Sequence, residues 1–145
     1  MPRLSFGILL SASIFAAEAK VALKDLPAAV QKAVRQETKT AKLRGLEKEI
    51  EHGKTYYEAE TTVNGKSRDI LIDPNGTIVE IEESVTLESL PEAARSGLKR
   101  AAGIGKILRV ESITRGSTVS YEALIERHGE KVEASVSADG LRRKD

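Results

Sequence analysis

Residues 54–83 read KTYYEAETTVNGKSRDILIDPNGTIVEIEE, and this stretch carries the clearest structural signals in the chain. Apolar or small residues alternate with polar ones over 57–63 and again over 68–72. Alternation with a period of two predicts half-buried antiparallel strands. Between the two runs lies Asn64-Gly65, a dipeptide that favours a two-residue hairpin turn. The stretch therefore predicts a β-hairpin with one apolar face.

The segment Asp73-Pro74-Asn75-Gly76 predicts a second turn, which leads into a further strand over 77–82. Its spacing up to Glu82 also fits part of a calcium-binding loop. The first ligand position of such a loop would be Leu71, whose side chain has no oxygen. We therefore interpret these residues as a β-turn and predict no metal site here.

The same pattern returns later in the chain at a constant offset. Leu26-Pro27 matches Leu90-Pro91, and Tyr57-Glu58-Ala59 matches Tyr121-Glu122-Ala123. A repeat of this length predicts that each half forms one supersecondary unit. The proposed division places repeat 1 at 20–83 and repeat 2 at 84–145.

Each half opens with a predicted helix, because Pro27 and Pro91 are each followed by apolar residues at helical spacing. Gly103 is expected to end the second helix. We therefore predict an α+β fold. It is a tandem repeat of a helix followed by three to four antiparallel strands, with the helix packed on one face of each sheet. A unit of about 60 residues is marginally stable alone, so the two should share an interface or continue one sheet.

The first 19 residues have the three-part pattern of a secretory signal peptide. Arg3 gives a positive start, 4–17 is an uncharged and mostly apolar run, and Ala17-Glu18-Ala19 supplies small residues for the peptidase. The run is short for a membrane-spanning helix, which needs about 20 apolar residues. We expect cleavage after Ala19, a periplasmic or secreted protein, and no transmembrane segment in the mature chain.

Composition narrows the functional classes. The chain has no cysteine, which rules out disulfides, thiolate metal sites and cysteine nucleophiles. Its net charge is +1, and both phenylalanines, Phe6 and Phe15, lie in the predicted signal. Without excess positive charge or aromatic platforms, nucleic-acid binding is not expected. His52 and His128 have no partner at the spacing of a zinc site or catalytic triad, so we predict a non-enzyme without cofactors.

The order of the Leu-Pro helix, the Tyr-Glu-Ala strand, the Asn-Gly-Lys hairpin and the segment 70–83 resembles the PepSY domain. More closely, it is similar to the tandem PepSY-like group with a β-lactamase-inhibitor-protein-like fold. That resemblance implies a small exported bacterial protein without enzymatic activity, and some relatives inhibit peptidases or β-lactamases. Those β-lactamase inhibitors have aromatic-rich concave sheets and disulfides, which this chain lacks, so β-lactamase inhibition is not carried over.

The leading functional hypothesis is a binding or inhibitory module of the cell envelope that contacts a protein or peptide, as a monomer or homodimer. Its contact surface would be the solvent-facing side of the sheet, with Tyr56, Glu58 and Glu60 as candidate contact residues. Tyr57 and Tyr121 are interpreted as core residues. One alternative is a stress-responsive periplasmic protein that binds cations weakly through exposed carboxylates. Another is a small hydrolase without a recognisable nucleophile–base pair.

Overall fold

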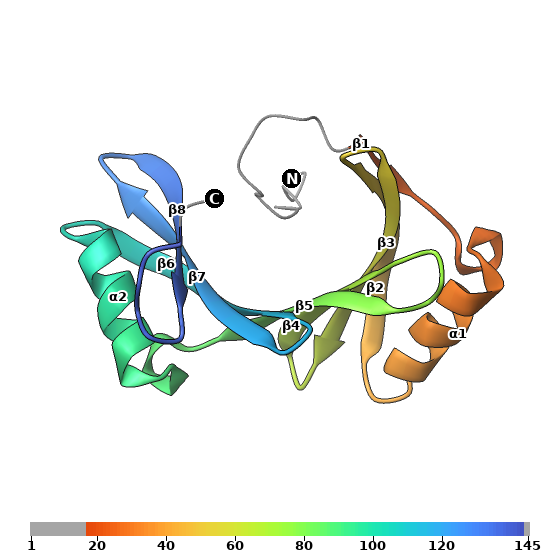
Figure 1. The fold of residues 1–145 in the computed structure, drawn as a ribbon, viewed down its shortest axis with the longest axis horizontal. Helices are drawn as coiled ribbons and strands as arrows, with labels where there is room; N and C mark the ends of the chain where they lie inside the picture. Colours follow the sequence, from red (N-terminus) through yellow and green to blue (C-terminus); the bar gives the residue numbers. More distant parts are fainter. Residues whose placement is uncertain (1–16, 144–145) are drawn as a thin grey trace.

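The computed structural model describes residues 17–143. They form one eight-stranded antiparallel sheet in which every strand pairs with its neighbour in the sequence (Figure 1). The strands are β1 (Ala17–Lys20), β2 (Lys42–Glu51), β3 (Lys54–Val63), β4 (Lys66–Ile72), β5 (Ile78–Val85), β6 (Lys106–Arg115), β7 (Thr118–Arg127) and β8 (Glu130–Ser137).

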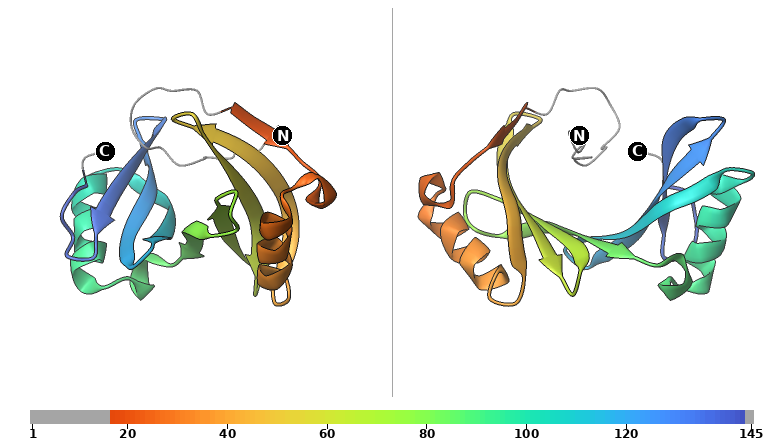
Figure 2. Two further views of the ribbon diagram at one scale, coloured as in Figure 1. Left: turned by 45° about the vertical axis from the view of Figure 1, so that its right-hand side comes forward. Right: turned by 180° about the vertical axis from the view of Figure 1, so that it is seen from behind.

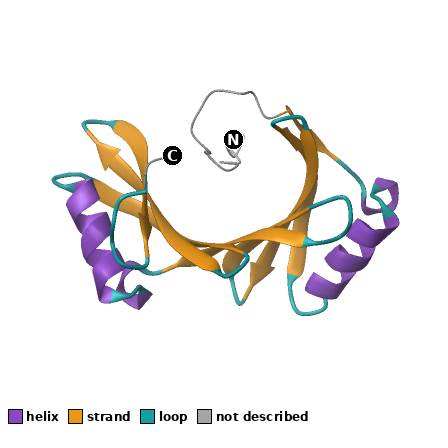
Figure 3. Cartoon of the chain, in the orientation of Figure 1, coloured by secondary structure: helices purple, strands orange, loops and turns teal. Residues whose placement is uncertain are grey.

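Two α-helices lie on the same side of this sheet. Helix α1 (Ala28–Glu37) follows a short 3₁₀ turn at Leu23–Asp25, and α2 (Glu92–Ala102) follows another at Leu87–Ser89. The sheet is curved, and the helices cover its convex face near the two ends (Figures 1 and 2). The secondary-structure view shows that the described chain is mostly strand (Figure 3). Among residues 17–143, no helix lies over the concave face.

The predicted helix boundaries are close to the observed ones. Pro27 and Pro91 are the N-cap residues, immediately before the first helical residues. Proline suits the start of a helix because its missing N–H would have no intrahelical acceptor there. Gly103 has a φ of 57° and ends α2, as expected from glycine's tolerance of positive φ.

Each helix packs over its own hydrophobic cluster. Val30 and Val34 of α1 are buried against Ala59 and Ile70 of the sheet. In the second half, Leu98 of α2 is buried with a larger set from β6, β7 and β8: Val110, Ala123, Ile125, Ala134 and Val136. Tyr57 and Tyr121 pack against these clusters, which confirms their interpretation as core residues.

The predicted fold class is wrong in its architecture. A tandem repeat of a helix and three to four strands, each with its own sheet, does not describe the molecule, because all strands belong to one sheet. The connection is made by β5, which pairs with β4 on one edge and with β6 on the other, from Ile81↔Thr114 to Val85↔Val110. Pairing both edges leaves no open row of N–H and C=O groups between the two halves. Of the two expectations for how the halves are joined, a shared interface or one continuous sheet, the structure confirms the continuous sheet.

The predicted hairpin turns are present. Asn64 and Gly65 have φ values of 49° and 78°, the left-handed conformation that a tight hairpin requires. The carboxylate of Asp73 accepts backbone hydrogen bonds from Asn75 and Thr77 at 2.9 and 3.0 Å, which confirms the turn interpretation of this segment. Glu82 lies within β5 and plays no part in that turn.

The register of the sheet shifts at three places, and the shift in β6 changes the face of a predicted core residue. The pairing of β6 with β7 shifts between Ile107 and Arg109, so one extra residue is inserted. Simple alternation predicts that Leu108 shares a face with Val110, but Leu108 is 39% exposed, while Ile107 packs on the core. A β-bulge changes which face the following residues occupy, and sequence alternation alone does not reveal it.

Most of the predicted signal peptide lies outside the described residues. Ala17, Glu18 and Ala19 belong to β1, so cleavage after Ala19 would remove most of that strand. The proposed division between 83 and 84 falls within β5. No helix in the region 17–143 is long and apolar enough to span a membrane.

Candidate functional site

The concave face of the sheet is the candidate site. Residues paired across antiparallel strands share a face, and Ala59 and Ile70 face the helix side. Side chains at alternate positions therefore face the concave side. They include Glu47 and Glu49 of β2; Tyr56, Glu58 and Glu60 of β3; Asp69 and Leu71 of β4; Glu80 and Glu82 of β5; Glu111 of β6; and Glu122 of β7.

This face brings carboxyl groups directly opposite one another. Glu47 pairs with Glu58, and Asp69 lies between Glu60 on β3 and Glu82 on β5. Like charges at directly opposed positions destabilise a sheet. Several of these groups are also shielded from water: Glu49 is 1% exposed and Glu80 is 4% exposed. Buried glutamates are rare unless they are paired, so each needs a partner.

Arginines supply that partner at three places. Arg44 lies 2.7 Å from Asp69 and 3.7 Å from Glu60, measured between nitrogen and carboxylate oxygen. Arg115 forms an ion pair with the buried Glu80. The third pair lies further along the sheet, where Arg109 is 3.1 Å from Glu111.

Three other carboxyl groups, on neighbouring positions of two strands, form what we call the β2–β3 carboxyl cluster: Glu47, Glu49 and Glu58. Within residues 17–143, none of the three forms an ion pair with an arginine. Lys20 of β1 acts on Glu47 electrostatically. One carboxylate oxygen of Glu47 and one of Glu58 are buried without a hydrogen-bond partner in the described structure. An unpaired buried acceptor costs about 1–3 kcal/mol.

Some of these carboxyl groups keep their protons, which reduces the repulsion between them in the absence of a paired arginine. Burial raises the pKa of Glu58, and the neighbouring charge of Glu49 raises it further. Burial also raises the pKa of Glu49, while the hydrogen bond that it accepts from Glu58 opposes that rise. On β5, burial raises the pKa of Glu82, whose carboxyl group is hydrogen-bonded to Glu80. The concave face therefore holds protons on carboxyl pairs at a pH where isolated carboxylates are ionised.

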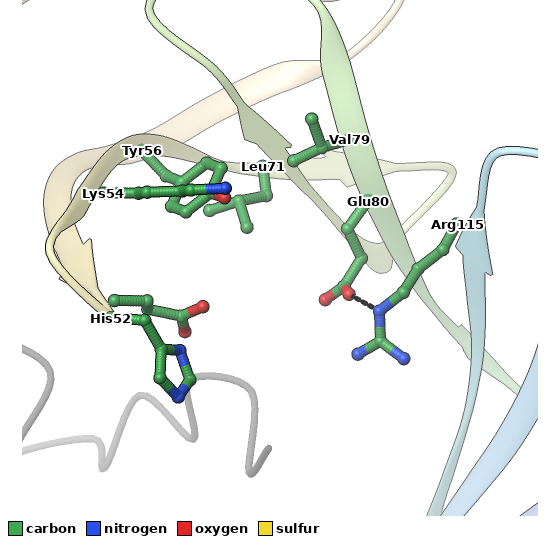
Figure 4. A pocket seen from close by; sticks show the side chains of 8 residues that line it. His52, Lys54, Tyr56, Leu71, Val79, Glu80 and Arg115 are labelled. Carbon is green, nitrogen blue, oxygen red and sulfur yellow. Dashed lines mark hydrogen bonds and ion pairs between the residues drawn. The ribbon is translucent and has the colours of Figure 1, made fainter. Parts of the chain in front are cut away.

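A pocket, drawn in Figure 4, opens on the same face. It lies next to the cluster, because its lining residue Tyr56 is paired with Glu49 across β2 and β3. It has a volume of about 420 Å³ and combines an apolar side with a charged rim. Its apolar side consists of Tyr56, Leu71 and Val79. The rim consists of Glu51, His52, Lys54, Glu80 and Arg115, and Figure 4 shows the last two joined by their ion pair.

The three candidate contact residues lie on this face. Tyr56 lines the pocket, and Glu58 belongs to the carboxyl cluster. Glu60 lies beside Arg44, on the row next to Glu58. They share a surface as expected from the alternation of β3, and their role as contact residues stays a prediction.

Sequence reasoning missed the residues that other strands bring to the site. Leu71 is 7% exposed although it faces away from the helices. The signal for it was the unbroken apolar run Ile70-Leu71-Ile72, which is typical of a strand buried on both faces. Glu80 and Arg115 come together only because β5 pairs with β6, a relation that no local pattern predicts.

Two groups of carboxylates have a spacing that suits a metal ion. Glu47, Glu58 and Glu60 each offer an oxygen within 4.8 Å of the others, as do Glu18, Glu47 and Glu49. Oxygen ligands are those that calcium and magnesium prefer. Cleavage after Ala19 would remove Glu18 from the second group. Only the first group therefore lies entirely within the predicted mature chain.

Comparison with known proteins shows similarity in fold. No protein-family model matches the chain, and no curated protein does either. Among solved structures, a Bacteroides eggerthii protein assigned to the periplasm has 18% identity and a TM-score of 0.69, with 82% of this chain and 86% of that chain covered. A Bacteroides uniformis protein of the DUF2874 family has 18% identity and a TM-score of 0.67, with 81% and 86% covered.

A third solved structure is relevant to the family resemblance found in the sequence. It is a BLIP-like protein from Bacteroides fragilis, with 18% identity and a TM-score of 0.62, and the alignment covers 82% of this chain and 84% of that chain. At this identity the likeness concerns the fold. The chain therefore has the fold of a BLIP-like protein, which agrees with the β-lactamase-inhibitor-protein-like part of the resemblance.

Proposed function

We propose that this protein is an exported, non-enzymatic binding module of the bacterial cell envelope that contacts another protein through the concave face of its sheet. The observation that carries the proposal is the placement of the helices. Both α1 and α2 cover the convex face, so no helix of the described part of the chain covers the concave face (Figures 1 and 2).

A solvated face is ordinary for an antiparallel sheet, and two further features distinguish this one. Its carboxyl groups include nearly fully buried ones, Glu49 and Glu80, which are costly to maintain. Its pocket places Tyr56, Leu71 and Val79 where a partner side chain can reach them. Tyrosine and partly buried apolar groups around a polar rim are typical of binding surfaces.

The periplasmic assignment of similar folds and the predicted signal peptide support an envelope location. The spacing of the two histidines in the sequence supports a non-enzymatic role, because neither has a partner at the spacing of a zinc site or catalytic triad. His52 and His128 each occupy a positive-φ position of a hairpin turn, with φ values of 49° and 52°. Their placement is explained by turn geometry.

Site-specific photo-crosslinking in intact cells tests the proposal. A benzophenone amino acid replaces Tyr56 on the concave face, and a matched variant carries it at Lys32, which is exposed on α1. We expect a discrete crosslinked envelope protein from position 56 and none from position 32. Equal crosslinking from both positions, or none from position 56, would contradict the proposal.

Weak cation binding is a second candidate, favoured by the spacing of Glu47, Glu58 and Glu60. Isothermal titration calorimetry with calcium, copper and zinc tests it on the mature chain. A heat signal that disappears in Glu47→Gln supports this candidate. A null titration with all three ions removes it.

A further inference from the structure

We propose that the concave face takes a cationic segment of its partner protein, with arginine or lysine side chains entering the β2–β3 carboxyl cluster. This inference rests on the proposed function, because it assumes that the concave face is the contact surface. It adds the chemistry of the occupant, which is a basic protein segment.

The first argument is the uneven distribution of charge over the molecule. The chain as a whole has a net charge of +1. Carboxyl groups nevertheless dominate the concave face, while lysines and arginines are exposed on the helices: Lys32, Arg35, Lys99 and Arg100. A concave surface of one sign attracts a partner surface of the other sign. The face that is free of helices is thus the negative one.

The second argument comes from the molecule's own arginines. At three places on this face, the fold sets one arginine against a carboxyl group: Arg44 with Asp69, Arg109 with Glu111, and Arg115 with Glu80. The β2–β3 carboxyl cluster is also crowded, but no arginine among residues 17–143 forms an ion pair with any of its three members. A guanidinium from a partner would complete the same arrangement.

The third argument is independent of charge. One oxygen of Glu47 and one of Glu58 are buried and accept no hydrogen bond in the described structure. Buried acceptors are normally satisfied by a donor. Arginine and lysine side chains are donors without acceptor atoms, and arginine can donate two parallel hydrogen bonds to a carboxylate. We therefore expect the unpaired oxygens to accept hydrogen bonds from the N–H groups of a ligand.

The neighbouring pocket favours a protein segment over a bare metal ion. Tyr56 lies opposite Glu49 in the register of β2 and β3, and its ring lines the pocket with Leu71 and Val79. An aromatic ring accommodates a guanidinium by stacking, and apolar walls accommodate the methylene groups of a long basic side chain. A bare ion would use none of these contacts.

Binding measurements with two designed peptides test the inference. The probes are a fluorescein-labelled helical peptide with arginines at every fourth position and its counterpart with glutamates at the same positions. The protein variants are Glu47→Gln/Glu58→Gln and a control, Glu92→Gln/Glu130→Gln. The control removes the same number of charges from exposed residues outside the concave face.

We expect the arginine peptide to bind the wild-type mature protein and the glutamate peptide not to bind. The Glu47→Gln/Glu58→Gln variant should bind about tenfold more weakly, and the control variant should match wild type. Binding should tighten as the pH rises from 5 to 8, because the cluster must release protons to accept a cation. Thermal melts of both variants serve to check that they are folded.

Three results would overturn the inference. The arginine peptide might fail to bind wild type, might bind the cluster variant as tightly as the control, or might be displaced by millimolar calcium that binds in its place. Persistent crosslinking from position 56 together with any of these results would leave the proposed function intact and reject a cationic occupant. Loss of crosslinking at position 56 with retained peptide binding would reject the proposed function instead.

Discussion

Glu58 on β3 donates a carboxyl hydrogen bond to Glu49 on β2, on the sheet face that the helices leave bare. Two acidic side chains can share this position because one of them keeps its proton. The arrangement is typical of like charges in a partly buried site, where burial and mutual repulsion both oppose the second ionisation. It makes the concave face sensitive to pH and to any cation that reaches it.

Stability should fall as the pH rises through neutrality. The pKa values of Glu49, Glu58 and Glu82 are raised in the folded chain above the ordinary 4.5, so above pH 4.5 the folded state binds more protons than the unfolded chain. Stability then decreases with pH until these groups ionise. We expect Tm to drop by roughly 5 °C between pH 5 and pH 8. Circular dichroism melts at constant ionic strength measure this, and a flat or rising Tm would contradict it.

Removing one acid from the pair should stabilise the protein at alkaline pH. In Glu58→Gln an amide replaces the carboxyl group and still donates a hydrogen bond to Glu49. We expect the free energy of unfolding to rise by about 1 kcal/mol at pH 8, with little change at pH 5. Urea denaturation at both pH values measures the difference. The exposed Glu130→Gln serves as the control, and equal effects of the two substitutions would argue against the coupled pair.

The helix starts and hairpin turns were predicted correctly from the sequence, because residues at those positions determine them. Pro27 and Pro91 fixed the helix starts, and Asn64-Gly65 fixed a hairpin, since these residues restrict φ and ψ whatever surrounds them. The alternation of β3 placed Tyr57 in the core and Tyr56 on the other face. Those assignments depend only on neighbours in the chain.

The global arrangement depended on relations that no local pattern contains. The pairing of β5 with β6 follows an intervening helix, so the single sheet could not be distinguished from two sheets by periodicity. The bulge at Leu108 moved that residue out of the core by inserting one unpaired position. The pocket needed the same β5–β6 pairing, because it joins Arg115 to Glu80 and Leu71.

The ion pair of Arg115 with Glu80 should contribute to stability. Glu80 is 4% exposed, and Arg115→Gln would leave its buried carboxylate without a cation. We expect the free energy of unfolding at pH 7.5 to fall by about 1–2 kcal/mol. Urea denaturation measures it, with Arg142→Gln, an exposed arginine near the end of the described chain, as the control. An unchanged midpoint would show that Glu80 is satisfied by other groups.

Export should produce a mature chain that begins at Lys20. The residues Ala17-Glu18-Ala19 present small side chains at the two positions that a signal peptidase recognises. Expression of the full chain in a Gram-negative host, followed by fractionation and N-terminal sequencing, measures the outcome. Recovery of uncleaved protein from the cytoplasm would contradict the predicted signal.

Gly140 is expected to be one of the least replaceable residues in the fold. It has a φ of 82°, and a Cβ added there would lie 2.1 Å from the backbone oxygen of Ala93 at the start of α2. Gly53 shares the positive φ, 76°, but an added Cβ there meets nothing within 4 Å. The pair of substitutions therefore separates backbone strain from steric contact.

We expect Gly53→Ala to lower the free energy of unfolding by about 1 kcal/mol, from the left-handed backbone alone. Gly140→Ala adds a clash with a fixed carbonyl group, so its loss should reach roughly 3 kcal/mol. Urea denaturation of both variants at pH 6 measures the difference. Similar losses at the two sites would mean that α2 can move away from the turn at Gly140, and that the close approach does not fix the position of the helix on the sheet.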